Sequence, residues 1–120
     1  MPSIMTHSLV GLAAGAVATR NRKKMPPRFW LLSLVCPALP DLDVLAFSFG
    51  IPYSDPLGHR GFFHSLLFAL LLGGVVATFF FRRNGLFSRA WWGCSAYFFA
   101  ITASHGLLDA FTNGGLGIAL

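Results

Sequence analysis

The sequence contains no glutamate, and four aspartates carry all of its acidic charge. Charged residues amount to 11% of the chain, against roughly 25% in ordinary soluble domains. Hydrophobic residues reach 55%, although a domain of this size buries only about 60% of its surface. The shortage of charge therefore argues against an ordinary soluble domain and predicts that membrane lipid covers part of the apolar surface.

Cysteine is also scarce, since Cys36 and Cys94 are the only two in the chain. Both lie within apolar runs, where buried thiols are a simpler interpretation than a disulfide. The N-terminus lacks a positively charged region followed by an apolar core and a cleavage site, so no cleaved signal peptide is expected. The length of 120 residues predicts a single domain, residues 1–120.

Nine lysines and arginines give the chain a net charge of +5. Most of them lie in two linkers, residues 20–28 and 82–89, beside apolar segments. Under the positive-inside rule, such clusters mark the cytoplasmic side of a membrane protein. They lack the interleaved aromatic residues on one basic face that are typical of nucleic-acid-binding modules, so no nucleic-acid partner is expected.

Four apolar segments make up most of the remaining chain. Residues 62–81 run without a charge for about the 20 residues that a transmembrane helix needs. Gly11 and Gly15 on one face of the first segment, and Gly73–Gly74 in the third, predict close helix packing. Together the segments predict an all-α fold, a membrane-embedded helical bundle of about four apolar helices. The four apolar segments are residues 4–19, 29–51, 62–81 and 90–111.

Proline interrupts the second segment at Pro37 and Pro40. Because proline lacks a backbone N–H and clashes with the preceding turn, we expect the helix to break there. Asp41 and Asp43 follow the break and would lie at the positively polarised start of a new helical piece. One aspartate could simply cap that helix, but two in an apolar stretch leave capping and ligand roles both open.

Ionisable side chains inside apolar segments are costly, so each needs a partner or a function. With both basic linkers in the cytoplasm, seven histidines and aspartates fall in the outer half of the bundle. His105 and Asp109 are four residues apart and share a helix face. His7, considered alone, is more readily a surface histidine at a helix start. The seven residues are His7, Asp41, Asp43, His59, His64, His105 and Asp109.

Mixtures of imidazole and carboxylate suit Zn²⁺, Fe²⁺ or Mn²⁺. Seven candidate ligands exceed one tetrahedral site and allow two ions about 4 Å apart, which would hold an activated water and clamp a phosphoester. Arg60 lies between His59 and His64 in the sequence. It could bind a substrate phosphate or pair with Asp55, and both interpretations remain open.

Four short motifs in this order resemble those of the YdjM-like family, across essentially the whole chain. They are Met5-Thr6-His7, Leu39-Pro40-Asp41-Leu42-Asp43, His59-Arg60-Gly61 with His64-Ser65, and Ser104-His105-Gly106-Leu107-Leu108-Asp109. The family comprises bacterial inner-membrane proteins described as LexA-regulated, membrane-bound, metal-dependent hydrolases. It is in turn similar to the zinc-dependent phospholipase C and single-strand nuclease fold, which is all-helical and uses a His-x-x-x-Asp pair in a multi-zinc site.

The resemblance implies a divalent metal, in the first place zinc, held by the seven histidines and aspartates named above. It also implies a multi-pass protein of the bacterial inner membrane, and the basic linkers place the site on the outer side. The zinc phospholipases have further His and Glu ligands, whereas this chain has no glutamate and no histidine after His105. Family members also commonly continue into another apolar segment, whereas this sequence stops at Leu120.

Three hypotheses follow. In the first, the protein is a metal-dependent hydrolase of a phosphoester resembling a lipid headgroup, and membrane lipid surrounds it. A metal-activated water would be the nucleophile, Asp41 or Asp43 the general base, and Arg60 a substrate-binding residue. In the second, it binds metal without catalysis, as a sensor or transporter. In the third, its histidines and aspartates only pair with each other in a structural bundle. The substrate, the metal and the oligomeric state stay open.

Overall fold

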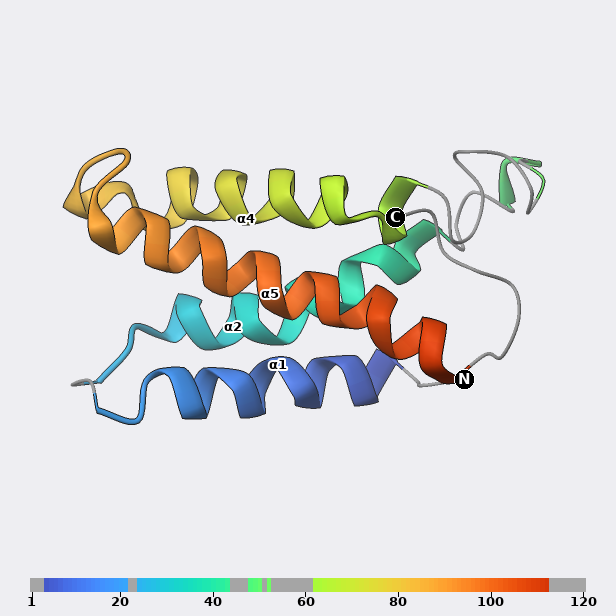
Figure 1. The fold of residues 1–120 in the computed structure, drawn as a ribbon, viewed down its shortest axis with the longest axis horizontal. Helices are drawn as coiled ribbons and strands as arrows, with labels where there is room; N and C mark the ends of the chain where they lie inside the picture. Colours follow the sequence, from blue (N-terminus) through green and yellow to red (C-terminus); the bar gives the residue numbers. More distant parts are fainter. Residues whose placement is uncertain (1–3, 22–23, 44–47, 51, 53–61, 113–120) are drawn as a thin grey trace.

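The computed structural model describes residues 4–21, 24–43, 48–50, 52 and 62–112. Within these ranges the fold is all-α, as predicted, and contains no strand. The four main helices extend roughly along one axis, with the α1–α2 and α4–α5 connections at the same end (Figure 1). The elements are α1 (Ile4–Ala18), α2 (Pro27–Val35), η1 (Cys36–Asp43), η2 (Phe62–His64), α4 (Leu66–Phe80), η3 (Arg82–Asn84) and α5 (Arg89–Thr112), where η denotes a 3₁₀ helix.

Helix α5 is the centre of the bundle, because it packs along α4 and also contacts η1, α1 and η2. The close approach of α4 depends on Gly73. A Cβ atom at this position would lie 2.6 Å from the carbonyl oxygen of Ser95 and 2.9 Å from the backbone nitrogen of Phe99. Gly74 faces open space. The packing contact predicted for the glycine pair therefore rests on Gly73 alone.

Gly11 and Gly15 bring α1 against its neighbours, as their spacing predicted. A Cβ at Gly11 would collide with the carbonyl group of Ser33 in α2, and one at Gly15 would lie 2.8 Å from the hydroxyl of Tyr97 in α5. The same Tyr97 hydroxyl donates to the carbonyl oxygen of Gly11 at 3.0 Å and lies 2.9 Å from the Ser33 hydroxyl. One tyrosine thus joins three helices.

The apolar core lies toward the end that carries the basic linkers. Phe98 is completely buried, and its ring centroid lies 5.7 Å from that of Phe81 and 6.0 Å from that of Phe29. Cys36 belongs to this core, and burial raises the pKa of its thiol to about 12. No disulfide joins Cys36 to the half-buried Cys94. The predicted buried thiol is therefore confirmed for Cys36.

Helix α2 ends at Val35, and the chain continues as the 3₁₀ helix η1 with Pro40 inside it. The predicted break near the prolines is thus confirmed, because proline cannot donate the i→i−4 hydrogen bond of an α-helix. Asp41 and Asp43 lie at the end of η1. The helical piece predicted after them falls on residues 44–47, which lie outside the described ranges, so it stays a prediction.

Helix α4 begins later than predicted, because Ser65 caps it. The Ser65 hydroxyl accepts a hydrogen bond from the backbone nitrogen of Phe68 at 3.1 Å, and the preceding residues form the tighter turn η2. Its 15 residues reach only about 22 Å. Among the described helices, none is both long and apolar enough to cross a membrane. The transmembrane helix predicted over residues 62–81, and the multi-pass topology built on it, are therefore not supported.

Candidate metal centre

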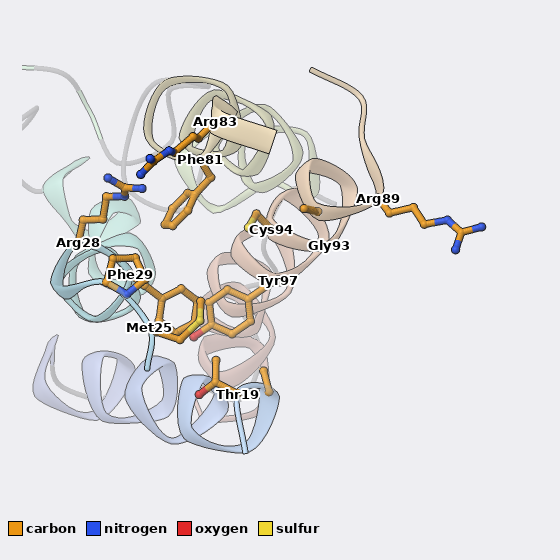
Figure 2. Close-up of a pocket in the computed structure, with 13 residues that line it drawn as sticks. Thr19, Met25, Arg28, Phe29, Phe81, Arg83, Arg89, Gly93, Cys94 and Tyr97 are labelled. Carbon is orange, nitrogen blue, oxygen red and sulfur yellow. The ribbon is translucent and has the colours of Figure 1, made fainter. Parts of the chain in front are cut away.

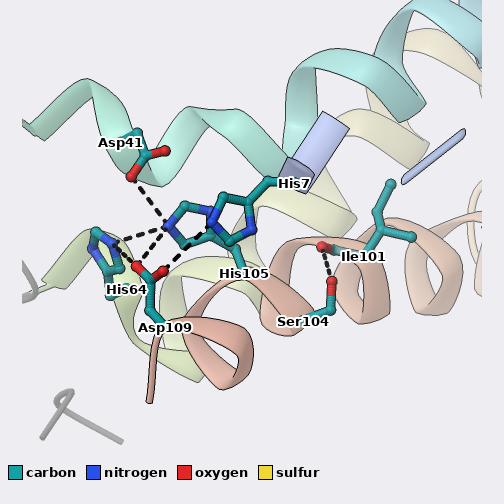
Figure 3. Close-up of polar contacts among 7 residues, drawn as sticks. All are labelled: His7, Asp41, His64, Ile101, Ser104, His105 and Asp109. Carbon is teal, nitrogen blue, oxygen red and sulfur yellow. Dashed lines mark hydrogen bonds and ion pairs between the residues drawn. The ribbon is translucent and has the colours of Figure 1, made fainter. Parts of the chain in front are cut away.

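Five of the seven predicted site residues meet at one end of the bundle, opposite both basic linkers (Figures 1 and 3). They come from four elements, which makes the meeting a product of the tertiary fold. Asp41 is half-buried, and the other four are buried. By element, His7 comes from α1, Asp41 from η1, His64 from η2, and His105 and Asp109 from α5.

Four of these residues can hold a single ion. One ligand atom from each of Asp41, His64, His105 and Asp109 lies within 4.8 Å of the other three. The Nε2 atom of His105 is 3.1 Å from that of His64, 3.3 Å from Oδ1 of Asp41 and 3.4 Å from Oδ2 of Asp109. The same Oδ2 atom is 3.5 Å from Nε2 of His64. Both imidazoles therefore point their Nε2 atoms at a common point.

These separations are compatible with a metal site. The nitrogen–oxygen distances are long for hydrogen bonds, which commonly measure about 2.7–3.2 Å. In a tetrahedral site, ligand bonds of about 2.0–2.2 Å place neighbouring ligand atoms about 3.3–3.6 Å apart. The two histidine nitrogens alone are close enough for a good hydrogen bond. The donor set of two imidazoles and two carboxylates therefore fits a divalent ion.

The charge of the cluster leads to the same conclusion. With neutral histidines, Asp41 and Asp109 give it a formal charge of −2, and only 6% of the Asp109 side chain is exposed. A buried carboxylate is costly without a compensating charge. Among the described residues, the ion pairs of both carboxylates are with histidines. A divalent ion would balance the charge without protonating any of them.

Asp41 is the most accessible member of the group, with 17% of its side chain exposed. Partial burial opposes its ionisation, but the side-chain contact with His105 and the electrostatic effect of the neighbouring histidines outweigh that effect. The net result is a lowered pKa for Asp41. Its carboxylate is therefore ionised at neutral pH, and it lies nearest to solvent.

His7 lies beside the four-atom group. Its ring lies against that of His105, tilted by 35° with centroids 3.8 Å apart, and its Nε2 atom is 3.5 Å from Oδ1 of Asp109. Neither ring nitrogen has a hydrogen-bond partner among the described residues. Burial lowers the pKa of His7, and the nearby His105 adds to this, although Asp109 and Asp41 oppose it. The fold thus favours neutral His7, which keeps a lone pair on one buried nitrogen.

The remaining predicted residues are not placed in the cluster by the structure. Asp43 ends η1, but its side chain lies outside the described part, as do His59, Arg60 and Asp55. The predicted second ion, the substrate role of Arg60 and the catalytic role of Asp43 therefore stay predictions. Sequence reasoning also missed a cavity at the basic end. The signal for it was an arginine beside a phenylalanine at one edge of each basic linker, at Arg28–Phe29 and Phe81–Arg82.

Comparisons with known proteins agree with the sequence motifs. The profile of the YdjM inner membrane protein family matches residues 1–120. The inner membrane protein YbcI of Escherichia coli (strain K12) is 38% identical over 118 residues, which cover 98% of this chain. The chain spans 65% of the length of this curated relative. No solved structure matches the chain. The resemblance is thereby confirmed, and the chain belongs to the YdjM inner membrane protein family.

Proposed function

We propose that the protein is a membrane-bound, metal-dependent hydrolase of a phosphoester, with a divalent ion such as zinc as its cofactor. One observation carries this proposal: ligand atoms of two histidines and two aspartates, from three elements, lie within 4.8 Å of one another in a buried cluster. Phosphoester hydrolysis is a reaction that such sites commonly support. The membership in an inner membrane protein family supports the location.

The residues divide into holding and proton-transfer roles. His64, His105 and Asp109 are buried and would hold the ion. A bound divalent ion would polarise the phosphoester and lower the pKa of a water molecule. Asp41 is ionised and the most exposed of the four, so its carboxylate is placed to accept a proton from the attacking water. His7 contacts the second oxygen of Asp109 and orients that carboxylate.

A second candidate function is metal binding without catalysis, as in a sensor. The specific observation in its favour is the number of protein ligands. Four protein groups fill a tetrahedral site, as in structural zinc sites, whereas catalytic sites keep one position for water or substrate. The two functions therefore differ in whether Asp41 binds the ion permanently or is available as a base.

The deciding experiment measures metal content and phosphodiesterase activity of the detergent-purified protein after loading with Zn²⁺ or Mn²⁺. We expect Asp109→Asn to lose the ion and all turnover. Asp41→Asn should retain most of the metal and lose turnover by about 10²–10⁴-fold, the usual contribution of a general base. Ser104→Ala is the matched control, because this hydroxyl bonds the Ile101 carbonyl and points away from the cluster (Figure 3).

Two outcomes would contradict the hydrolase. If the loaded wild-type protein holds no ion above background, the cluster is structural. If Asp41→Asn abolishes metal binding and the wild type holds metal but hydrolyses no phosphoester, the site is closed and the second function holds.

The basic end of the bundle is proposed to face the cytoplasm and the metal centre the outer side, following the distribution of positive charge. Helix α4 supports contact with lipid, since Leu67, Leu70 and Phe79 expose 57%, 55% and 72% of their surface. Large exposed apolar patches are uncommon on soluble monomers.

A further inference from the structure

A cavity of about 360 Å³ lies at the basic end of the bundle, away from the metal centre. It is bounded by the end of α1, the start of α2, η3 and the start of α5. Pockets for small molecules commonly measure about 300–1,000 Å³, so this cavity lies at the lower end of the range. It has room for a headgroup and the adjoining carbon atoms, and it is too small for a whole lipid.

The inner wall of the cavity is apolar and aromatic. Phe29, Phe81, Tyr97 and Met25 line it (Figure 2). The polar groups of this wall are already engaged, since the Tyr97 hydroxyl bonds Gly11 and lies against Ser33. What the wall offers a ligand is therefore mainly ring surface, which suits a hydrocarbon portion.

The rim of the cavity is positively charged. The guanidinium groups of Arg28 and Arg83 lie on the same side of it, near Phe81, whereas Arg89 extends away (Figure 2). Arg28 is centred 5.4 Å from the centroid of the Phe81 ring. Two guanidinium groups at one opening attract an anion between them, and arginine matches phosphate oxygens with paired hydrogen bonds.

No carboxylate of the described residues provides that anion. The sequence has four acidic residues. Asp41 and Asp109 belong to the metal centre at the other end, and Asp43 ends η1 two residues after Asp41. The lining of the cavity includes no acidic side chain. The described lining therefore leaves the positive charge of the rim free to attract an anionic ligand.

We propose that this cavity is a binding site for an anionic phospholipid, with the phosphate between Arg28 and Arg83 and the adjoining carbons against Phe29, Phe81 and Tyr97. A free phosphate would leave the aromatic wall without a partner, and a purely apolar ligand would leave the arginines without one. The inner leaflet is rich in anionic lipid, which attracts basic residues near it. The site is independent of the metal centre and of any hydrolysis.

The test is native mass spectrometry of the detergent-purified full chain with phosphatidylglycerol, phosphatidylcholine, or soluble glycerol phosphate as the probe. We expect retention of phosphatidylglycerol over phosphatidylcholine. The Arg28→Gln/Arg83→Gln variant should lower its retention at least about tenfold, since a hydrogen bond to a charged group is worth about 1.5–3 kcal/mol. The matched control is Arg20→Gln/Arg82→Gln, which removes the same charge from exposed positions that do not line the cavity.

A second variant tests the apolar part with the arginines intact. Gly93 lines the cavity, and a Cβ atom there meets nothing within 4 Å, so Gly93→Leu should fold and obstruct the site. Lipid retention should fall while metal content stays unchanged. Equal losses in both double-arginine variants would overturn the proposal in favour of non-specific surface charge. Equal retention of both lipids, or displacement of phosphatidylglycerol by glycerol phosphate, would overturn it as well.

Discussion

Asp109 uses its two carboxylate oxygens for different partners. Oδ2 lies 3.4 Å from Nε2 of His105 and 3.5 Å from that of His64, whereas Oδ1 lies 3.5 Å from Nε2 of His7. Three histidines from three elements therefore depend on this single buried carboxylate. Any substitution at this position changes both the candidate metal ligands and the environment of His7.

The lowered pKa of His7 leads to a prediction about stability in the metal-stripped protein. Burial favours neutral His7 in the fold, so the unfolded chain takes up the proton more readily as the pH falls below about 6.5. Stability should therefore decrease between about pH 7.5 and about pH 5. The lowered pKa of Asp41 acts in the same direction, but only below its ordinary value of 3.8.

Replacing His7 with glutamine removes the titrating group and should flatten this pH dependence. The measurement is denaturant unfolding of the chelator-treated wild type, His7→Gln and the control Ser104→Ala at several pH values. The same slope in His7→Gln as in wild type would show that His7 does not carry the effect.

At the scale of elements, two of the five clustered side chains come from short 3₁₀ turns and not from the longer helices. Asp41 comes from η1 and His64 from η2. Both turns exist for local reasons: Pro40 excludes α-helical hydrogen bonding in η1, and Ser65 starts α4 directly after His64. The η1 and η2 turns contact each other and α5, which brings their side chains to the same point.

The packing of α4 on α5 predicts opposite effects for two adjacent glycines. Gly73→Ala places a methyl group against the backbone of α5 and should destabilise the protein by about 1–3 kcal/mol. Gly74→Ala meets open space and should be neutral or stabilise it by up to about 1 kcal/mol, because alanine favours a helix over glycine. Denaturant midpoints of both variants provide the measurement, and equal stability of the two would refute this packing arrangement.

At the scale of the whole molecule, the bundle has two chemically different ends. Aromatic residues fill the basic end, where Phe29, Phe81 and Phe98 form the core. Histidines and aspartates from four elements gather at the other end. A bound ion would join η1, η2 and α5 there, and these elements are far apart in the sequence.

Metal removal should therefore lower the stability of the entire fold. A ligand that binds only the folded state stabilises it by about 2.7 kcal/mol when its free concentration is a hundred times the Kd. We expect a chelator to lower the melting temperature of wild type, added Zn²⁺ to restore it, and Asp109→Asn to respond to neither. If neither treatment changes the melting temperature of the wild type, no ion joins these elements.

Local patterns in the sequence predicted the helices and the i, i+4 pair of His105 and Asp109. Segment length, proline breaks and glycine spacing act over a few residues, so α1 and α5 appear close to where they were expected. The same local logic failed at the start of α4, because a single serine cap and a 3₁₀ turn shortened an apolar run that had the length of a transmembrane helix.

The sequence by itself determined which side chains were available for a metal site, because a chain with four acidic residues and four histidines leaves few candidates. Only the tertiary structure decided which of them meet. His64 and His105 are 41 positions apart, yet their Nε2 atoms lie 3.1 Å from each other. Such contacts depend on the close approach of helices at Gly11 and Gly73, and on the direction in which each turn presents its side chain. No local pattern encodes these distances, because they arise from packing between segments distant in the chain.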